Sequence, residues 1–122
     1  MARILVIDDE GEIRAILQDT LEAAGYEVRV AGDGNEGLAI QQEWAADLVI
    51  TDIFMPDKEG IETIIELQER YPGTRIIAMS GGGALRTLDY LSSAEHFGAI
   101  RTISKPFDCE ALIATVRDIL AR

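Results

Sequence analysis

The sequence Ile4-Leu5-Val6-Ile7-Asp8-Asp9 places four consecutive aliphatic residues directly before two acids. A short continuous aliphatic run of this kind predicts a strand that is buried on both faces. A second run, Leu48-Val49-Ile50-Thr51, leads into Asp52 in the same way. Strands that are buried on both faces are typical of parallel sheets with helices on either side. The two runs therefore predict an α/β fold.

Further strand-like runs alternate with stretches of helical period along the whole chain. We expect strands over 4–7, 27–31, 48–51, 75–79 and 100–104, and helices over about 13–24, 38–44, 61–67, 84–97 and 112–120. In the first helix, the residues expected on the inward face are Ile13, Ile16, Leu17, Thr20, Leu21 and Ala24, and Gly25 ends the helix. A crossover helix is what returns a parallel strand to its sheet, so five such units predict a doubly wound parallel sheet.

Size and charge exclude several classes of protein. A chain of 122 residues is about the length of one domain, so we expect a single domain over 1–122. Its 11 basic and 22 acidic residues give a net charge of −11, which argues against direct contact with nucleic acid or an anionic membrane. The lone Cys109 forms no internal disulfide, and no signal peptide or membrane span is apparent. We expect a cytoplasmic protein.

Polar residues follow four of the five predicted strands. Asp8 and Asp9 follow the first strand, Asp52 the third, Ser80 the fourth and Lys105 the fifth. In open α/β sheets, ligands bind outside the carboxyl ends of the strands, where the strand order reverses. These five residues, although far apart in sequence, are therefore expected to form one cluster.

The chemistry of this cluster suits phosphoryl transfer. Carboxylates held close together repel one another, and a divalent cation neutralises them; oxygen ligands favour Mg²⁺ or Mn²⁺. An aspartate carboxylate can attack phosphorus to give an aspartyl phosphate, while a nearby ammonium such as that of Lys105 offsets charge on the transferred oxygens. Ser80 could donate its hydroxyl to a phosphoryl oxygen and so convert a local charge into a change of shape.

The residues at these positions match a known family. Asp8-Asp9, the segment Asp52-Ile53-Phe54-Met55-Pro56 with Gly60, Ser80, and Lys105-Pro106-Phe107 resemble, in order and spacing, the receiver domain of two-component response regulators. The resemblance covers essentially the whole chain. It implies a flavodoxin-like fold of five βα units with strand order 2-1-3-4-5.

The resemblance also implies a role for each acid. Asp52 would accept phosphate from a histidine kinase or a phosphotransfer protein. Asp8, Asp9 and Asp52 would hold Mg²⁺, together with the backbone carbonyl of Phe54. The domain would then be a signalling switch and not a conventional enzyme, catalysing only its own phosphorylation and dephosphorylation.

The remaining motif residues have implied roles on the signalling side. Ser80 would be the switch hydroxyl and Lys105 the partner of the phosphate, with a cis peptide bond between Lys105 and Pro106. The chain reaches its end soon after the last predicted helix, so we expect a standalone receiver that acts in trans on a downstream protein target. A weak homodimer is a further expected partner.

Two departures from the family pattern fall on the output side. Thr102 stands in the fifth strand where an aromatic switch residue is common, and a small hydroxyl side chain cannot sweep the volume of a ring. The stretch from Ser80 to Lys105 spans 105 − 80 = 25 positions, a few more than usual, and it begins with Gly81, Gly82 and Gly83. Both departures concern the route of signal transmission, and every motif residue of the phosphorylation site is present.

Several residues have simpler interpretations. Asp9 with Glu12 fits a helix capping box, a role that can coexist with metal binding. His96 is read as a surface or boundary residue, since no second His or Cys stands beside it. Cys109 is interpreted as a passive, half-buried residue and Trp44 as a packing residue.

Two other function classes compete with the receiver interpretation, and a third is excluded by its missing motif. A haloacid-dehalogenase-type phosphatase also uses an aspartate nucleophile on a doubly wound sheet, but it needs an Asp-x-Asp pair after the first strand, and Asp8-Asp9-Glu10 does not supply one. A phosphorylation-independent adaptor would normally have lost part of the site, and its affinity for Mg²⁺ would distinguish it. A nicotinamide-binding domain is excluded because the first turn lacks GxGxxG.

Overall fold

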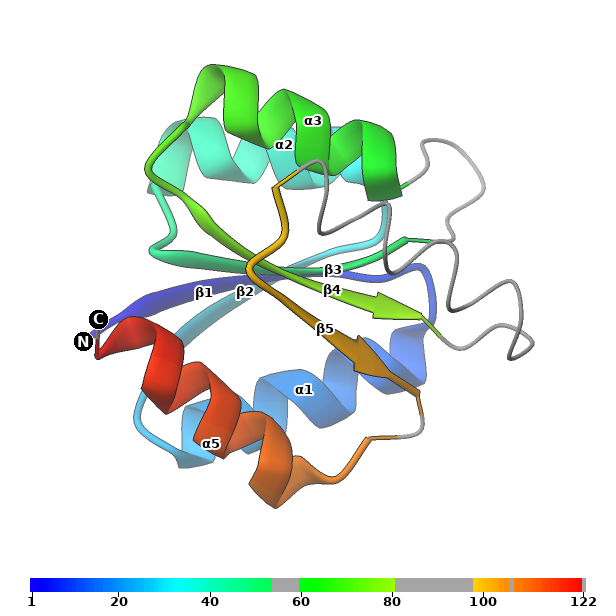
Figure 1. Ribbon diagram of the computed structural model, residues 1–122. Coiled ribbons are helices and arrows are strands. Elements are labelled where there is room, and N and C mark those ends of the chain that lie inside the picture. Colours follow the sequence, from blue (N-terminus) through cyan, green and yellow to red (C-terminus); the bar gives the residue numbers. More distant parts are fainter. Residues whose placement is uncertain (54–59, 81–97, 106, 122) are drawn as a thin grey trace.

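The computed structural model describes residues 1–53, 60–80, 98–105 and 107–121, except for the side chain of Ser80. Five parallel strands form one sheet in the order β2-β1-β3-β4-β5 (Figure 1). Their bounds are β1 Arg3–Ile7, β2 Glu27–Ala31, β3 Leu48–Asp52, β4 Arg75–Ser80 and β5 Arg101–Ser104. The expected doubly wound parallel sheet, including its strand order, is confirmed.

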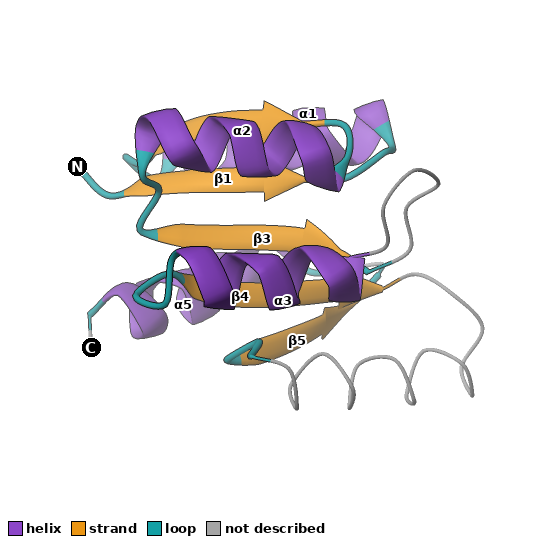
Figure 2. Ribbon diagram, turned by 90° about the horizontal axis from the view of Figure 1, so that it is seen from above, coloured by secondary structure: helices purple, strands orange, loops and turns teal. Residues whose placement is uncertain are grey.

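Helices cover both faces of this sheet (Figures 1 and 2). The four helices in the described part of the chain are α1 Gly11–Ala23, α2 Gly34–Trp44, α3 Gly60–Arg70 and α5 Cys109–Leu120. Helices α1 and α5 lie on one face, and α2 and α3 lie on the other (Figure 1). The helix expected over 84–97 falls outside the described residues, as do Gly81, Gly82, Gly83 and His96.

Each face of the sheet has its own hydrophobic core, because successive side chains of a strand point to opposite sides. In β1, Ile4 and Val6 belong to the core shared with α1 and α5, and Leu5 and Ile7 belong to the core shared with α2 and α3. Every residue of β3 is buried. The central position of β1 and β3 explains why their sequences are aliphatic without interruption.

The start of α1 differs from the sequence expectation. The helix begins at Gly11 with Glu10 as its N-cap, and no side chain makes a capping hydrogen bond. The predicted capping box of Asp9 and Glu12 is therefore wrong. The first helical carbonyl is that of Glu10, which accepts from the Arg14 N–H over 3.1 Å, so Asp9 lies one residue before the cap position.

Other boundaries and packing positions follow the predicted pattern with local exceptions. Gly25 ends α1 with a φ of +98°, a conformation that glycine adopts readily. Ile16 was expected to face inward but is 46% exposed. The buried residues of α1 are Leu17 and Leu21, so the buried face of the helix is smaller than predicted. Strand β5 begins at Arg101 and leaves Ile100 exposed, although the Ile100 N–H still donates to the Ile76 carbonyl over 2.8 Å.

The packing role expected of Trp44 and the half-buried position expected of Cys109 are confirmed. Trp44 is buried at the end of α2, and the guanidinium carbons of Arg3 and Arg29 lie 5.6 and 5.0 Å from its ring centroid. Cys109 is half-buried at the start of α5, with its Sγ 3.6 Å from the Thr20 hydroxyl. Within the described residues, none of the helices has the length and apolar character that crossing a bilayer requires.

Candidate functional site

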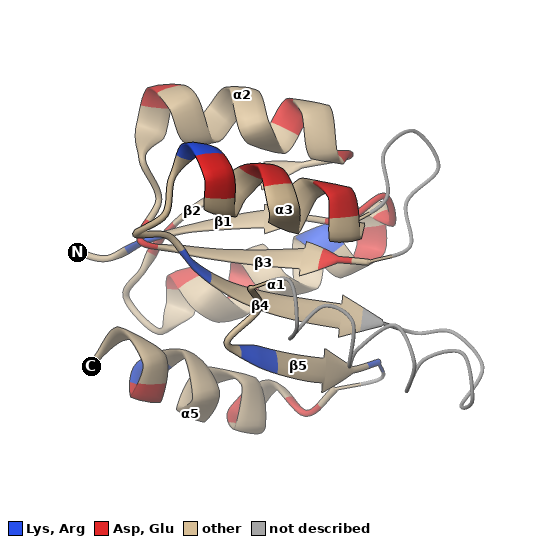
Figure 3. Cartoon of the chain, turned by 45° about the horizontal axis from the view of Figure 1, so that its top comes forward, with Lys and Arg blue, Asp and Glu red and all other residues tan. Residues whose placement is uncertain are grey.

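Four carboxylates meet at the carboxyl ends of β1 and β3. Asp8 directly follows β1 and is fully buried, and Asp52 is the last residue of β3 and is 4% exposed. Because β1 and β3 are paired neighbours, these two residues leave the sheet side by side. One carboxylate oxygen from each of Asp8, Asp9, Glu10 and Asp52 lies within 4.8 Å of the others. Figure 3 shows the acids gathered at this edge of the sheet.

The ammonium group of Lys105 enters this cluster from the end of β5. Its Nζ lies 2.7 Å from Asp8 Oδ2, 3.3 Å from Glu10 Oε1 and 3.3 Å from Asp52 Oδ2. The Lys105 side chain is only 9% exposed, and its three ion pairs hold the ammonium group among the acids. One cation thus offsets part of the charge of four carboxylates. The structure brings Asp8, Asp9, Asp52 and Lys105 together, as the sequence predicted.

Burial and charge act in opposite directions on the pKa values of Asp8 and Lys105. Burial raises the pKa of the Asp8 carboxyl above its ordinary value, and the contacts with Lys105 and with the Glu10 N–H lower it only in part. Burial by itself would lower the pKa of Lys105. The contact with Asp8 and the charge of Asp52 outweigh that effect, so the pKa of Lys105 is raised. Lys105 therefore stays an ammonium at neutral pH.

The donor set fits a hard divalent cation. All four groups are carboxylates, which are ligands that Mg²⁺ and Mn²⁺ prefer. Asp8 Oδ1 accepts from the Glu10 N–H over 2.9 Å, and within the described part of the chain the buried Oδ2 is paired only with the Lys105 ammonium, at 2.7 Å. A buried carboxylate oxygen left in this way is suited to a cation. The cluster could hold a metal ion.

Two of the remaining predicted residues belong to strands β4 and β5. Ser80 is the last residue of β4, in register with Ser104, and Thr102 is half-buried in β5 opposite Ala78. Phe54 and Pro106 fall outside the described residues, so the carbonyl ligand and the cis peptide stay predictions.

Sequence reasoning missed two residues at this edge. Glu10 contacts Lys105, and Arg14 donates from Nη1 to the Asp8 carbonyl oxygen over 2.7 Å. A signal was present for both, since Glu10 directly follows the acid pair and Arg14 stands four residues later, one helical turn along α1.

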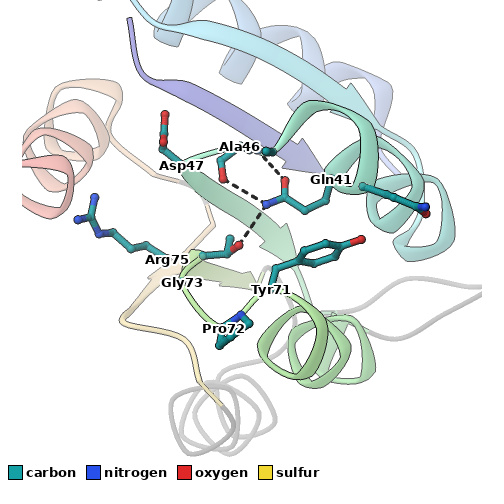
Figure 4. A pocket seen from close by; sticks show the side chains of 10 residues that line it. Gln41, Ala46, Asp47, Tyr71, Pro72, Gly73 and Arg75 are labelled. Carbon is teal, nitrogen blue, oxygen red and sulfur yellow. Dashed lines mark hydrogen bonds between the residues drawn. The ribbon is translucent and has the colours of Figure 1, made fainter.

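A separate hollow of about 420 Å³ lies at the opposite edge of the sheet, where β3 and β4 begin (Figure 4). Its wall is built around Gln41, which donates from Nε2 to the Ala46 carbonyl and the Thr74 hydroxyl, both over 3.1 Å, and accepts from the Ala46 N–H over 2.9 Å. Every polar atom of this amide is thus used to join the two turns. Of the predicted site residues that the structure describes, none lines the hollow.

The fold and the acidic edge together define a class: a flavodoxin-like α/β protein whose carboxylates and lysine converge at the topological switch point. Within that class, the chain matches the family model of the response regulator receiver domain over residues 4–117. The chain belongs to the response regulator receiver family. Receiver domains are signalling domains of two-component systems.

Curated relatives and solved structures agree with this family. The chain is 36% identical over its whole length to the transcriptional regulatory protein CpxR of Klebsiella pneumoniae, and 37% identical over 98% of its length to the DNA-binding transcriptional regulator NtrC of Azospirillum brasilense. It spans 50% of that CpxR and 24% of that NtrC.

Two solved structures resemble the chain over nearly all of both molecules. A receiver domain protein from Methanospirillum hungatei is 30% identical with a TM-score of 0.91, covering 99% of this chain and 94% of the other. The chemotaxis protein CheY4 of Vibrio cholerae is 32% identical with a TM-score of 0.88, covering 97% and 98%.

Proposed function

We propose that this domain is a phosphoacceptor switch in which Asp52 takes a phosphoryl group from a histidine kinase or a phosphotransfer protein. One observation carries the proposal: the Asp52 carboxylate ends β3 within 3.3 Å of the Lys105 ammonium and inside a cluster of three further carboxylates. A nucleophilic carboxylate beside a fixed cation and an oxygen-only cation site is the arrangement that phosphoryl transfer to aspartate requires.

Each residue would contribute one part of the reaction. An Asp52 oxygen attacks the phosphorus as the bond from phosphorus to the donor's leaving atom breaks, and the leaving group departs with that electron pair. Lys105 offsets the negative charge on the transferred oxygens. Asp8, Asp9 and Asp52 would hold Mg²⁺, with the Phe54 carbonyl as a further ligand. When bound, the metal would neutralise the charge between the anionic donor and the carboxylate.

The output would follow from the same site. Ser80, at the end of the neighbouring strand, is proposed to donate its hydroxyl to the phosphoryl group and to draw its loop toward it. The resulting change would alter the face around β5, which contains Thr102, and hence binding to a downstream protein target. Gly81 to Gly83, which directly follow Ser80 in the sequence, are proposed to take part in this change. The relatives CpxR and NtrC are named as transcriptional regulators. For this chain, the downstream protein target is part of the proposal.

Intact-mass analysis with a small phosphodonor tests the proposal. Incubation with acetyl phosphate and Mg²⁺ should add one phosphoryl group, and excess chelator should prevent the addition. Asp52→Asn is the matched control and should stay unmodified, and Asp9→Ala should lose most of the labelling. Addition that persists in chelator, or that maps to another residue while Asp52 is intact, would refute the assignment.

A further inference from the structure

One side chain that the proposed chemistry does not use ties the acidic loop to helix α1. Arg14 is half-buried, and its Nη1 donates to the Asp8 carbonyl oxygen over 2.7 Å. A Cβ placed on Gly32, in the turn after β2, would lie 3.5 Å from the same nitrogen. The guanidinium therefore lies between the loop after β1 and the loop after β2.

Asp8 has four polar groups, and three of them form hydrogen bonds with backbone groups or with the Arg14 side chain. Its N–H donates to the Ala31 carbonyl over 3.1 Å, its Oδ1 accepts from the Glu10 N–H, and its carbonyl oxygen accepts from Arg14. The fourth, Oδ2, lies 2.7 Å from Lys105 Nζ. Of these three bonds, only the one to the carbonyl comes from a side chain, so it depends on a single residue.

The bond to the carbonyl controls more than Asp8 itself. The carbonyl of Asp8 belongs to the peptide unit that leads into Asp9, and a peptide unit is planar. Holding this oxygen sets the rotation of the whole unit, and with it the direction in which the exposed Asp9 carboxylate leaves the backbone. Without Arg14, a buried carbonyl would lose its charge-assisted partner and the unit could turn.

We propose that Arg14 is a positioning residue for the cation site: it orients the peptide unit between Asp8 and Asp9 so that both carboxylates reach one ion. This inference rests on the proposed function, which assigns the two acids to Mg²⁺. Charge alone predicts the opposite sign, because a guanidinium near the site repels a second cation. The direction of the change in Mg²⁺ affinity therefore separates positioning from charge.

The test is the Mg²⁺ dissociation constant of the intact protein, measured by titration calorimetry without any phosphodonor. Arg14→Met keeps an unbranched stem of similar length and removes the donor, and we expect binding about tenfold weaker, the usual scale for losing a group that orients a ligand. Arg14→Lys keeps the charge but not the planar fork, and it should weaken binding by a smaller factor. Arg117→Met, which changes an exposed residue of α5, alters the net charge equally and should bind as the parent does.

Unchanged or tighter Mg²⁺ binding in Arg14→Met would overturn the proposal, as would a lower metal-free melting temperature accompanied by an unchanged dissociation constant. If Arg14→Met does not fold, Arg14→Lys decides by the same criterion. Failure of the parent protein to bind Mg²⁺ would instead refute the metal site of the proposed function.

Discussion

At the scale of single residues, the most unusual group is Asp8. It is fully buried, carries a raised pKa, and has as its closest counter-charge a lysine 97 positions away in the sequence, at 2.7 Å. Burying a carboxylate against three others is unfavourable unless a cation is present. The Lys105 ammonium supplies one such positive charge next to Asp8. Repulsion between these carboxylates thus lowers the free energy of unfolding, and such unfavourable local contacts are common at functional sites.

The raised pKa of Asp8 predicts a specific dependence of stability on pH. A raised pKa means that the native state holds the proton more tightly than the unfolded chain does. The stability contributed by Asp8 is therefore fully present below its ordinary pKa of 3.8 and is lost as the pH rises through the raised value. Replacing Asp8 by Asn removes this loss. We expect the stability of Asp8→Asn relative to the parent, both metal-free, to increase as the pH rises from about 4 to about 7.

Urea denaturation of the two proteins at several pH values, in chelator, measures this difference directly. Subtracting the parent's free energy of unfolding from that of the variant at each pH removes the contribution of the acids that both proteins share. A difference that stays constant, or that falls as the pH rises, would show that ionised Asp8 is well accommodated by Lys105 alone. Repeating the series in excess Mg²⁺ should favour the parent, because the metal binds the ionised carboxyl.

At the scale of elements, helix α3 is docked closely against the end of β3. A Cβ on Gly60, the first residue of α3, would lie 2.1 Å from the Asp52 carbonyl oxygen and 2.4 Å from Ile53 Cα. Both are backbone atoms and cannot rotate aside. The Gly60 N–H also donates to the Ile53 carbonyl over 3.2 Å. Glycine is therefore needed here for close approach, and the approach positions the backbone of the proposed phosphoacceptor.

Gly60→Ala should accordingly destabilise the protein by about 2–3 kcal/mol, since the added methyl group can be accommodated only if α3 or the end of β3 shifts. Gly73→Ala is the matched control, because a Cβ there meets nothing within 4 Å and Gly73 is exposed. Chemical denaturation of both variants gives the comparison. Equal stabilities would mean that the end of β3 is free to move, and would contradict the close packing inferred for this junction.

At the scale of the whole molecule, the parallel topology brings the acidic residues and Lys105 together at the carboxyl ends of the strands. Strands β1 and β3 are neighbours, and β5 is two strands away from β3, yet Lys105 reaches across to the acids. The total charge of −11 adds to the repulsion at this edge. A divalent cation that binds only the folded state should relieve it and stabilise the entire domain by mass action.

We therefore expect Mg²⁺ to raise the melting temperature, by an amount equivalent to about 2.7 kcal/mol at a concentration one hundred times the dissociation constant. Asp52→Asn should be more stable than the parent without metal, by about 1 kcal/mol, because one buried like charge is removed while Lys105 keeps Asp8 and Glu10. Its gain from Mg²⁺ should be smaller. Differential scanning calorimetry measures both effects.

Glu43→Gln, which removes one exposed acid of α2, is the control for net charge. It should leave the response to Mg²⁺ unchanged. A metal-free Asp52→Asn that melts at or below the parent's temperature would show that repulsion at the acidic edge is weak.

The sequence by itself determined the class of fold and most of the site. Aliphatic runs and helical periods are local signals, and they predicted all five strands to within about one residue at each end. The convergence of Asp8, Asp9, Asp52 and Lys105 could also be predicted, because parallel strands present their carboxyl ends at one edge.

The tertiary structure alone decided which atoms meet there. It showed that Glu10 shares Lys105, that Arg14 holds the Asp8 carbonyl, that Gly60 must lack a side chain, and that Ile16 faces solvent. Such contacts depend on where a helix begins and how closely two elements pack. A one-residue shift in the start of α1 was enough to change the role expected of Asp9. Periodicity averages over several residues, so it carries no information at the scale of one hydrogen bond.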